Sequence, residues 1–323
     1  MAATAQDVKM FVGIDVSKDR LDVHIHPAGE RFALARDDSG LAELVSRFQS
    51  PFKNASLALI AIEATGGFEV NVVAALGAAG LPVVVVNPKQ VHNYAKALGV
   101  NAKTDVIDAA VIARFAADVK PEVRPLADAE TLVLGEFLTR RRQIVQMIVA
   151  EKNRALRGAT NASMQQSIRR IIAALEAELT RLDGDIDGLV KSSPVWLEKE
   201  ELMTSVPGIG EGIARTLLAE MPELGTLDRK QVAALAGLAP WTRQSGQWRG
   251  RSMIGGGRAV PRTMLFLGAM AAARHNPDLK AFSLRLLNAG KPKKVVITAI
   301  SRKLLTILNA ILRDKTPWQQ KTA

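Results

Sequence analysis

The stretch FVGIDVSKDRLDVHIHPAGERFALA, residues 11–35, decides the fold of the N-terminal part of this 323-residue chain. Residues 11–16 are a short apolar run with Asp15 near its end, and residues 21–26 and 31–34 alternate between apolar and polar side chains. Alternation with a period of two is typical of β-strands, because successive side chains point to opposite faces of a sheet. The stretch therefore predicts three strands of an antiparallel sheet.

The residues that follow predict alternating helices and strands. Their order is a helix at 37–49, a strand at 57–62 that runs into Glu63, a helix from Gly66 to about residue 79, a strand at 81–86, a helix from Pro88 and a helix at 104–117. The apolar run at 81–86 is of the kind that is buried on both faces of a sheet. This is the element order of the ribonuclease H-like fold, so we expect an α/β domain over residues 1–127.

The middle of the chain carries an apolar heptad repeat. Its members are spaced alternately by four and three residues, and they are Ile168, Ile172, Leu175, Leu179, Leu182, Ile186 and Leu189, with Met164 one step earlier. Such a seam is typical of a coiled coil and requires a partner helix. The partner is either the helix expected at about residues 130–157 or the same helix in a second protomer, and the two are compatible. We expect a helical connector over residues 128–198.

The last segment, residues 199–323, is expected to be mainly α-helical. It contains the turn VPGIG at 206–210, which leads into a helix that begins at Glu211. A glycine-rich turn at a helix N-terminus presents free backbone N–H groups, which suit a DNA phosphate as in a helix-hairpin-helix. A plain turn between helices has the same sequence pattern, so phosphate binding by Gly208 and Gly210 is one of two interpretations.

The composition excludes several classes of protein. The chain has no cysteine, which excludes a disulfide scaffold, a thiol nucleophile and every cysteine-based zinc or iron-sulfur site. With 48% apolar residues it can bury sizeable cores. The apolar runs are shorter than the roughly 20 residues that cross a bilayer, and polar residues interrupt the N-terminus. We therefore expect a soluble, cytoplasmic protein without membrane contacts.

The formal net charge of +11 resides in the last third of the chain. Residues 201–323 hold 19 Lys and Arg against 7 Asp and Glu, and between Arg229 and Pro277 there are eight basic residues and no acidic one. A basic surface without interspersed acids neutralises a phosphate backbone. Nucleic acid is therefore favoured over a generic basic surface.

Four carboxylates are candidates for metal binding. Asp15 and Glu63 end two apolar strands, and Asp105 and Asp108 are three residues apart on one face of an expected helix. Oxygen ligands without His or Cys suit Mg²⁺ or Mn²⁺, and a pair of such ions is the usual apparatus for displacement at phosphorus. Singly, each residue is better explained as a turn former, a strand end or a helix N-terminal charge. The combination favours metal binding, because an uncompensated carboxylate beside a buried strand is costly.

The second candidate site is the loop GLAPWTRQSGQWRGR at residues 237–251. Ser245 is flanked there by three arginines, Arg243, Arg249 and Arg251. A serine hydroxyl becomes a useful nucleophile where guanidinium groups bind the phosphate that it attacks. From the residues alone, the favoured interpretation is simpler: Ser245 caps a turn and the arginines bind DNA. Further candidates for nucleic-acid contacts are Arg258 and Lys291 for phosphate, and Trp241 and Trp248 for stacking on bases or for core packing.

Several motifs together resemble the DEDD transposases, which are the bridge-RNA-guided recombinases of bacterial insertion sequences and include the related Piv-type invertases. The motifs occur in the family's order from about residue 11 to 312: GIDVSK at 13–18, IEATG at 62–66, KTDVIDA at 103–109, VPGIG at 206–210, GLAP at 237–240 with SG at 245–246, and NP at 276–277 with GK at 290–291. The resemblance implies a RuvC-like N-terminal domain, a coiled-coil connector and a C-terminal transposase domain with a nucleophilic serine.

The same resemblance implies roles for individual residues and partners. Asp15, Glu63, Asp105 and Asp108 bind Mg²⁺, and Ser245 attacks DNA to form a covalent phosphoserine link. Donor and target DNA are the substrates, a noncoding guide RNA pairs with both, and homodimers form a tetramer in the synaptic complex. In that assembly the RuvC-like domain of one protomer meets the serine domain of another.

The expected function is mobilisation of an insertion sequence, and three alternatives stay open. The first is a RuvC-like nuclease or junction resolvase in which water attacks. The second is a catalytically inactive nucleic-acid-binding protein. The third is an actin-like ATPase, which requires a second glycine-rich nucleotide loop that the sequence does not contain.

Overall fold

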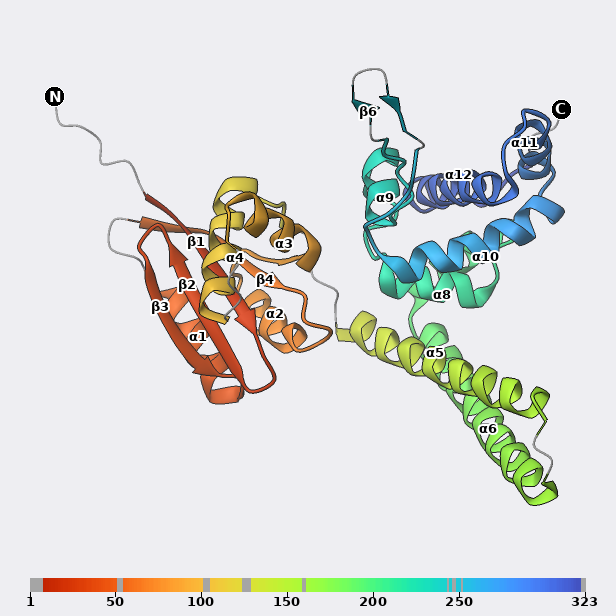
Figure 1. The fold of residues 1–323 in the computed structure, drawn as a ribbon, viewed down its shortest axis with the longest axis horizontal. Coiled ribbons are helices and arrows are strands. Elements are labelled where there is room, and N and C mark those ends of the chain that lie inside the picture. Colours follow the sequence, from red (N-terminus) through yellow and green to blue (C-terminus); the bar gives the residue numbers. More distant parts are fainter. Residues whose placement is uncertain are drawn as a thin grey trace. The chain divides into compact units, whose positions relative to one another are not determined.

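The structure is a computed structural model, and it describes residues 8–50, 55–100, 105–123, 129–158, 161–242, 244–245, 248–250 and 252–320. The chain divides into two compact units, residues 1–126 and 127–323. The first contains a sheet with helices on its faces (Figure 1). The second is mainly helical and begins with a long helical pair (Figure 1).

The first unit is built on a sheet whose described strands run in the order β3-β2-β1-β4-β5. Its elements are β1 (Val8–Val16), β2 (Arg20–His26), β3 (Glu30–Ala35), α1 (Asp38–Gln49), β4 (Ala55–Glu63), α2 (Glu69–Ala78), β5 (Val83–Val86), α3 (Pro88–Ala97) and α4 (Asp105–Val119). The first three strands pair antiparallel, whereas β4 runs parallel to both β1 and β5. The predicted order of strands and helices is confirmed.

Helices cover both faces of this sheet. On one face, Ile14 of β1 joins a buried cluster with Leu44 of α1 and Leu76 of α2. On the other face, Phe11 of β1 joins a second buried cluster with Ile112 of α4. Because side chains alternate along a strand, the odd-numbered residues at this end of β1 face α4.

Gly13 allows α4 to lie directly on β1. A Cβ atom at Gly13 would lie 2.2 Å from the carbonyl oxygen of Ala109 and 2.3 Å from the backbone nitrogen of Ala113. Both atoms belong to the backbone of α4, so any side chain at this position would displace the helix. The missing side chain therefore fixes the first turns of α4 against the strand that carries Asp15.

The prediction that residues 81–86 are buried on both faces is wrong in part. β5 is an edge strand, and Val85 is 41% exposed while Val84 and Val86 are buried beneath the α3 and α4 side. A run of apolar residues predicts a buried strand, but it does not predict whether that strand lies at the centre or at the edge of its sheet.

The second unit begins with a helical hairpin. α5 (Ala129–Leu156) and α6 (Ala162–Ser192) pack against each other through a buried cluster of Ile144, Ile148 and Leu182. At the base of the hairpin, Leu134 and Ile186 join the core of the remaining helices. The heptad helix packs on the preceding helix of the same chain, and a coiled-coil contact with a second protomer stays a prediction.

The rest of the unit is mainly helical, as predicted. Its elements are α7 (Pro194–Thr204), α8 (Glu211–Glu220), α9 (Arg229–Leu235), β6 (Gln244–Ser245), β7 (Trp248–Arg249), α10 (Ala259–His275), α11 (Pro277–Asn288) and α12 (Lys293–Asp314). The expectation of short apolar segments fails for α12, which is long and apolar enough to cross a bilayer by length and composition. In the structure Ile300, Leu304 and Leu308 of α12 are fully buried in the protein core, as in a central helix of a folded unit.

Candidate active site

Asp15 and Glu63 are neighbours at the ends of two parallel strands. Ile14 pairs with Ile62 in the register of β1 and β4, and Asp15 and Glu63 are the next residues on the two strands. Residues in register on adjacent parallel strands lie about 4.8 Å apart and point to the same face. The fold therefore brings together two half-buried carboxylates that are distant in the sequence.

Both carboxylates lie on the face of the sheet that α4 covers. Gly13 precedes Asp15 by two residues, and Ala61 precedes Glu63 by two, so each pair shares a face. Gly13 contacts the backbone of α4 at Ala109, and Ala61 is buried in the cluster that includes α4. The two strand ends therefore open towards α4.

Asp108 of α4 lies close to the same place. It directly precedes Ala109, whose carbonyl oxygen meets Gly13, and it precedes Ile112, buried against the sheet, by four residues. Positions four apart share a helix face, so Asp108 is on the side of α4 that faces the sheet. Asp105 lies three residues earlier in α4, and its side chain is outside the described residues.

The chemistry of these residues fits a hard divalent cation. Asp15, Glu63 and Asp108 offer carboxylate oxygens, which are the ligands that Mg²⁺ and Mn²⁺ prefer. Among the side chains that the structure describes, no three His, Asp or Glu groups lie close enough together to hold a metal ion. The fourth predicted ligand, Asp105, is not among those side chains. Asp15, Glu63 and Asp108 therefore do not form a three-carboxylate cluster by themselves, and metal binding by the four predicted ligands stays a prediction.

A further carboxylate, which the sequence analysis missed, lies across from Asp15. Asp22 of β2 is the antiparallel register partner of Asp15 and shares its face. Asp22 is only 5% exposed, and the Nη2 atom of Arg20 lies 2.9 Å from its Oδ1 atom. This ion pair compensates the charge of Asp22. This pairing could have been predicted from the sequence. In a hairpin with its turn at residues 17–20, Val16 pairs with Leu21 and Asp15 pairs with Asp22.

The turn that follows Glu63 is fixed by Glu69, another residue that the sequence analysis missed. The carboxylate of Glu69 accepts hydrogen bonds from the backbone N–H groups of Thr65 (3.1 Å) and Gly67 (2.8 Å) and from the Thr65 hydroxyl (3.0 Å). Burial opposes ionisation, but these hydrogen bonds outweigh it and hold the pKa of Glu69 below its ordinary value. The ionised Glu69 therefore holds the backbone directly after Glu63 at neutral pH.

Ser245 lies in a two-stranded ribbon of the second unit (Figure 1). β6 and β7 pair antiparallel with Ser245 opposite Trp248, and a bridge between Trp241 and Met253 closes the base of the ribbon. Ser245 is exposed, and among the described residues its hydroxyl makes no hydrogen bond. The next two residues of the turn, Gly246 and Gln247, lie outside the described residues, so turn capping by Ser245 stays a prediction, and the exposed hydroxyl is accessible to a large substrate.

The arginines around Ser245 are described only in part. Arg243 and Arg251 lie outside the described residues, and so does the side chain of Arg249, so their binding of phosphate stays a prediction. Arg258 has a different role. Its guanidinium donates hydrogen bonds to both carboxylate oxygens of Glu223 and supports the start of α10. Arg258 therefore has a structural role, and its contact with nucleic acid stays a prediction.

The remaining residues predicted to contact nucleic acid, Gly208, Gly210 and Lys291, lie outside the ribbon. Gly208 has a φ of 106°, and a Cβ atom there would lie 2.6 Å from the Cβ of Ala272, so this glycine permits close packing of the turn on α10. Gly210 is the N-cap of α8, and because glycine has no side chain it does not cap the first N–H groups of the helix. Lys291 is exposed after α11. Close packing requires a glycine at position 208, and phosphate binding by Gly208, Gly210 and Lys291 stays a prediction.

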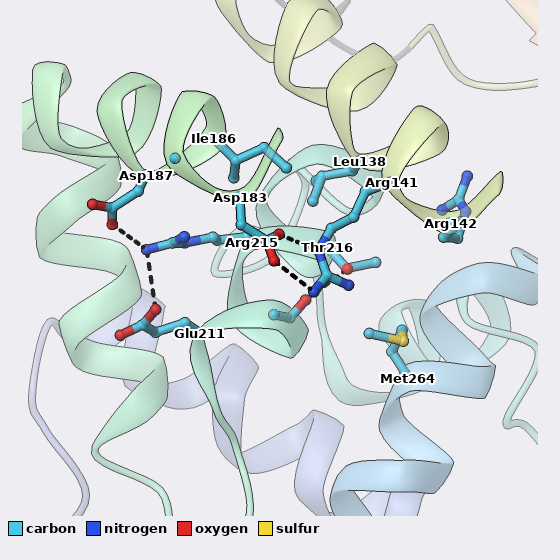
Figure 2. A pocket seen from close by; sticks show the side chains of 12 residues that line it. Leu138, Arg141, Arg142, Asp183, Ile186, Asp187, Glu211, Arg215, Thr216 and Met264 are labelled. Carbon is cyan, nitrogen blue, oxygen red and sulfur yellow. Dashed lines mark hydrogen bonds and ion pairs between the residues drawn. The ribbon is translucent and has the colours of Figure 1, made fainter. Parts of the chain in front are cut away.

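A network of charges joins the helical hairpin to α8. The guanidinium of Arg215 lies 2.6 Å from Glu200 and 3.0 Å from Asp187 of α6, and it also pairs with Glu211 at 3.3 Å. Figure 2 shows Arg215 between Asp187 and Glu211 at a pocket of about 410 Å³, with Arg141 of α5 opposite. The charged side chains of this pocket are paired with oppositely charged side chains of the protein. These ion pairs therefore fix the base of the hairpin to α8.

We expect Arg215→Ala to lower the free energy of unfolding by about 3 kcal/mol, because it leaves the carboxylate of Glu200 buried without its partner. Chemical denaturation followed by circular dichroism measures the change. Arg181→Ala on the exposed face of α6 is the control, since ion pairs of this kind between fully exposed side chains contribute little to stability. Equal stabilities of the two variants would contradict the role of Arg215.

Comparison with known proteins shows the family. A DEDD transposase family model matches residues 12–159, and a model described as the transposase of the IS116/IS110/IS902 family matches residues 200–284. The pilin gene-inverting protein of Moraxella bovis is 31% identical over 322 residues, which cover 97% of this chain and 98% of that protein. The chain belongs to the IS110 family of DEDD transposases. It is therefore an enzyme of the transposase and DNA-inverting recombinase type, which acts on DNA.

Other relatives of this IS110-family transposase match over a similar share of the chain. The pilin gene-inverting protein of Moraxella lacunata is also 31% identical over 322 residues, covering 97% of this chain and 98% of that protein. An uncharacterised 42 kDa protein of the insertion element IS900 from Mycobacterium paratuberculosis is 24% identical over 399 aligned residues, with the same two coverages. Asp15, Glu63 and Asp108 fall within the first family match, and Ser245 falls within the second.

Proposed function

We propose that this transposase has a RuvC-like, ribonuclease H-like domain that binds Mg²⁺ or Mn²⁺, and that it exchanges DNA strands through a covalent link to Ser245. The observation that carries the proposal is the placement of Asp15 and Glu63 side by side beneath α4, whose first turn carries Asp108. The strand order β3-β2-β1-β4-β5, with three antiparallel strands followed by two parallel ones, supports the fold.

The proposed chemistry divides between the two units. In the first step, Oγ of Ser245 forms a bond to phosphorus while the bond from phosphorus to the 3′ oxygen breaks, and the proton that serine loses is taken up by that 3′ oxygen. In the second step, a 3′ hydroxyl of the exchanged strand forms a bond to phosphorus while the bond from phosphorus to Oγ of Ser245 breaks, and the proton of that hydroxyl is taken up by Oγ. Each step exchanges one phosphate ester for another, so no ATP is required.

The carboxylates prepare the phosphate for this reaction. Asp15, Glu63, Asp105 and Asp108 would hold a divalent ion, which when bound offsets the negative charge that develops on the phosphate oxygens. Arg243, Arg249 and Arg251 would bind the same phosphate beside Ser245, since guanidinium groups form paired hydrogen bonds to phosphate.

Assembly and guidance complete the proposal. A noncoding guide RNA would pair with donor and target DNA, and the cytoplasmic enzyme would act as a dimer that forms a tetramer on DNA. Exposed apolar side chains on the outer half of the hairpin support contact between protomers: Leu156 is 84%, Met164 58% and Ile171 46% exposed. Apolar groups gathered on one helical pair indicate an interaction surface.

The proposal is tested in cells that carry the coding region together with its flanking DNA and a reporter plasmid with the joined ends of the element. We expect one small RNA from the flanking DNA to co-purify with the protein and the reporter to recombine. Recombination without any bound RNA would contradict guidance by RNA. Cleaved reporter that never carries covalently attached protein would favour the nuclease in which water attacks.

A further inference from the structure

A groove of about 1030 Å³ lies in the second unit, next to the base of the Ser245 ribbon. One stripe of α12 forms its long wall, because Val295, Ala299, Arg302 and Thr306 are spaced by three and four residues. The start of α9, Phe282 of α11 and residues 252–254 of the ribbon base form the other walls. The groove is therefore built by elements that also support the ribbon.

The rim of the groove is cationic. Its lining includes five basic side chains and no acidic one, and the five are Arg229, Lys230, Lys294, Arg302 and Lys303. Within the described part of the chain, none of them forms an ion pair with a carboxylate. Arg215 and Arg258 of the same unit are, in contrast, neutralised by Glu200 and Glu223. Lys303 lies over the Phe282 ring, 4.6 Å from its centroid, but no described carboxylate neutralises the five cations, so their charge is available to an anionic ligand.

The floor of the groove is apolar. It includes Leu238, Ile254, Phe282 and Ile307, and the neighbouring Met253 is 49% exposed. Apolar surface in a concave site favours a ligand that can bury flat, weakly hydrated groups. A nucleic-acid duplex presents phosphates outward and keeps its bases stacked inside, so it would contact the rim and leave the floor uncovered. An unpaired strand offers phosphates to the cations and bases to the floor.

We propose that this groove binds an unpaired stretch of nucleic acid, with its phosphates on the five cations and its bases on the apolar floor. The inference rests on the proposed function and extends it, since strand exchange directed by a guide RNA produces unpaired DNA and RNA near the site of cleavage. A strand in the groove would lie against the base of the ribbon that presents Ser245. Its sequence would be read weakly, because apolar contacts accept every base.

Equilibrium binding tests the charge of the groove. Fluorescence anisotropy is measured in EDTA, which prevents metal-dependent cleavage, with oligothymidylate, oligouridylate and a duplex of the same length. We expect Arg302→Glu to weaken binding of the single strands about tenfold or more and to change duplex binding by less than about twofold. The slope of log affinity against log salt is expected to fall by about 0.7 for each lost phosphate contact. The two oligonucleotides separate DNA from RNA as the preferred strand.

Lys280→Glu is the matched control for this experiment. Lys280 is an exposed lysine of α11 in the same unit, and it does not line the groove. We expect Lys280→Glu to change single-strand binding by less than about threefold. An equal loss in both variants, or an equal loss for duplex and single strands, would overturn the proposal, because it would show only a dependence on total charge.

A second variant tests the floor without changing the charge. Ala299→Trp places a large side chain in the groove, and we expect it to weaken single-strand binding at least about fivefold while the melting temperature stays close to that of the unchanged protein. Unchanged binding would overturn the proposal, and so would tighter binding of an acidic amphipathic peptide than of either oligonucleotide. If the single strands bind as expected but no DNA becomes attached to Ser245, the groove is retained and the proposed chemistry fails.

Discussion

Replacing Ser245 with alanine is expected to abolish the covalent link between protein and DNA and to reduce strand exchange about 10³-fold or more. The reason is that the proposed reaction passes through a bond between Oγ of Ser245 and phosphorus, and alanine has no atom that can form this bond. The measurement is a gel assay for protein attached to labelled DNA, run beside a recombination reporter. Ser245 is exposed at the ribbon, so we expect the melting temperature to remain close to that of the unchanged protein.

Thr242→Val is the control for the loss of a hydroxyl from the same ribbon. The Thr242 hydroxyl forms a 2.7 Å hydrogen bond with that of Ser252, and Thr242 does not line the groove, so its loss removes an exposed contact and no group of the proposed reaction. We expect Thr242→Val to retain adduct formation. Cleavage that continues unchanged in Ser245→Ala would show that water is the nucleophile and that the serine is structural.

The positions of the predicted carboxylates follow from strand patterns that are visible in the sequence. Asp15 and Glu63 each end a run of apolar residues, and two such strands that become neighbours in parallel register place their last residues together. The antiparallel pairing of the first three strands follows from alternation and from short turns. These features depend on local periodicity, which is why the sequence analysis could reach them.

Asp22 and Glu69 have partners nearby in the sequence, but the other features that the sequence analysis did not predict depend on contacts between distant segments. Arg258 belongs to a basic stretch, but its role follows from Glu223, a residue 35 positions away. Gly208 is a candidate for phosphate binding, and its close approach to Ala272 of α10 gives it a packing role that its spacing does not predict. The groove along α12 combines residues of α9, α11 and the ribbon base, and no spacing rule joins them. Basic residues and glycines in the sequence indicate candidates for nucleic-acid contacts. Tertiary contacts show which of these residues also have a role in packing.

Asp15→Asn is expected to reduce DNA cleavage and strand exchange about 10³-fold while the protein stays folded. The amide keeps the size of the side chain but removes the negative charge that would bind a divalent ion, and loss of several kcal/mol of charge stabilisation in the reaction corresponds to this decrease in rate. Folding should tolerate the change, because asparagine keeps the size and the hydrogen-bonding oxygen of the half-buried Asp15 side chain. Metal-dependent adduct formation and thermal melting are the measurements.

Asp19→Asn is the matched control, because Asp19 is an exposed carboxylate in the turn between β1 and β2, four residues from Asp15. We expect this variant to retain full activity and full binding of Mn²⁺, whereas Asp15→Asn binds Mn²⁺ weakly by electron paramagnetic resonance. Weak Mn²⁺ binding together with lost adduct formation places the role of Asp15 at the metal. If both variants recombine DNA equally, the carboxylates at the strand ends do not form the reactive centre. In that case the nucleic-acid-binding protein without catalysis becomes the better account of the first unit.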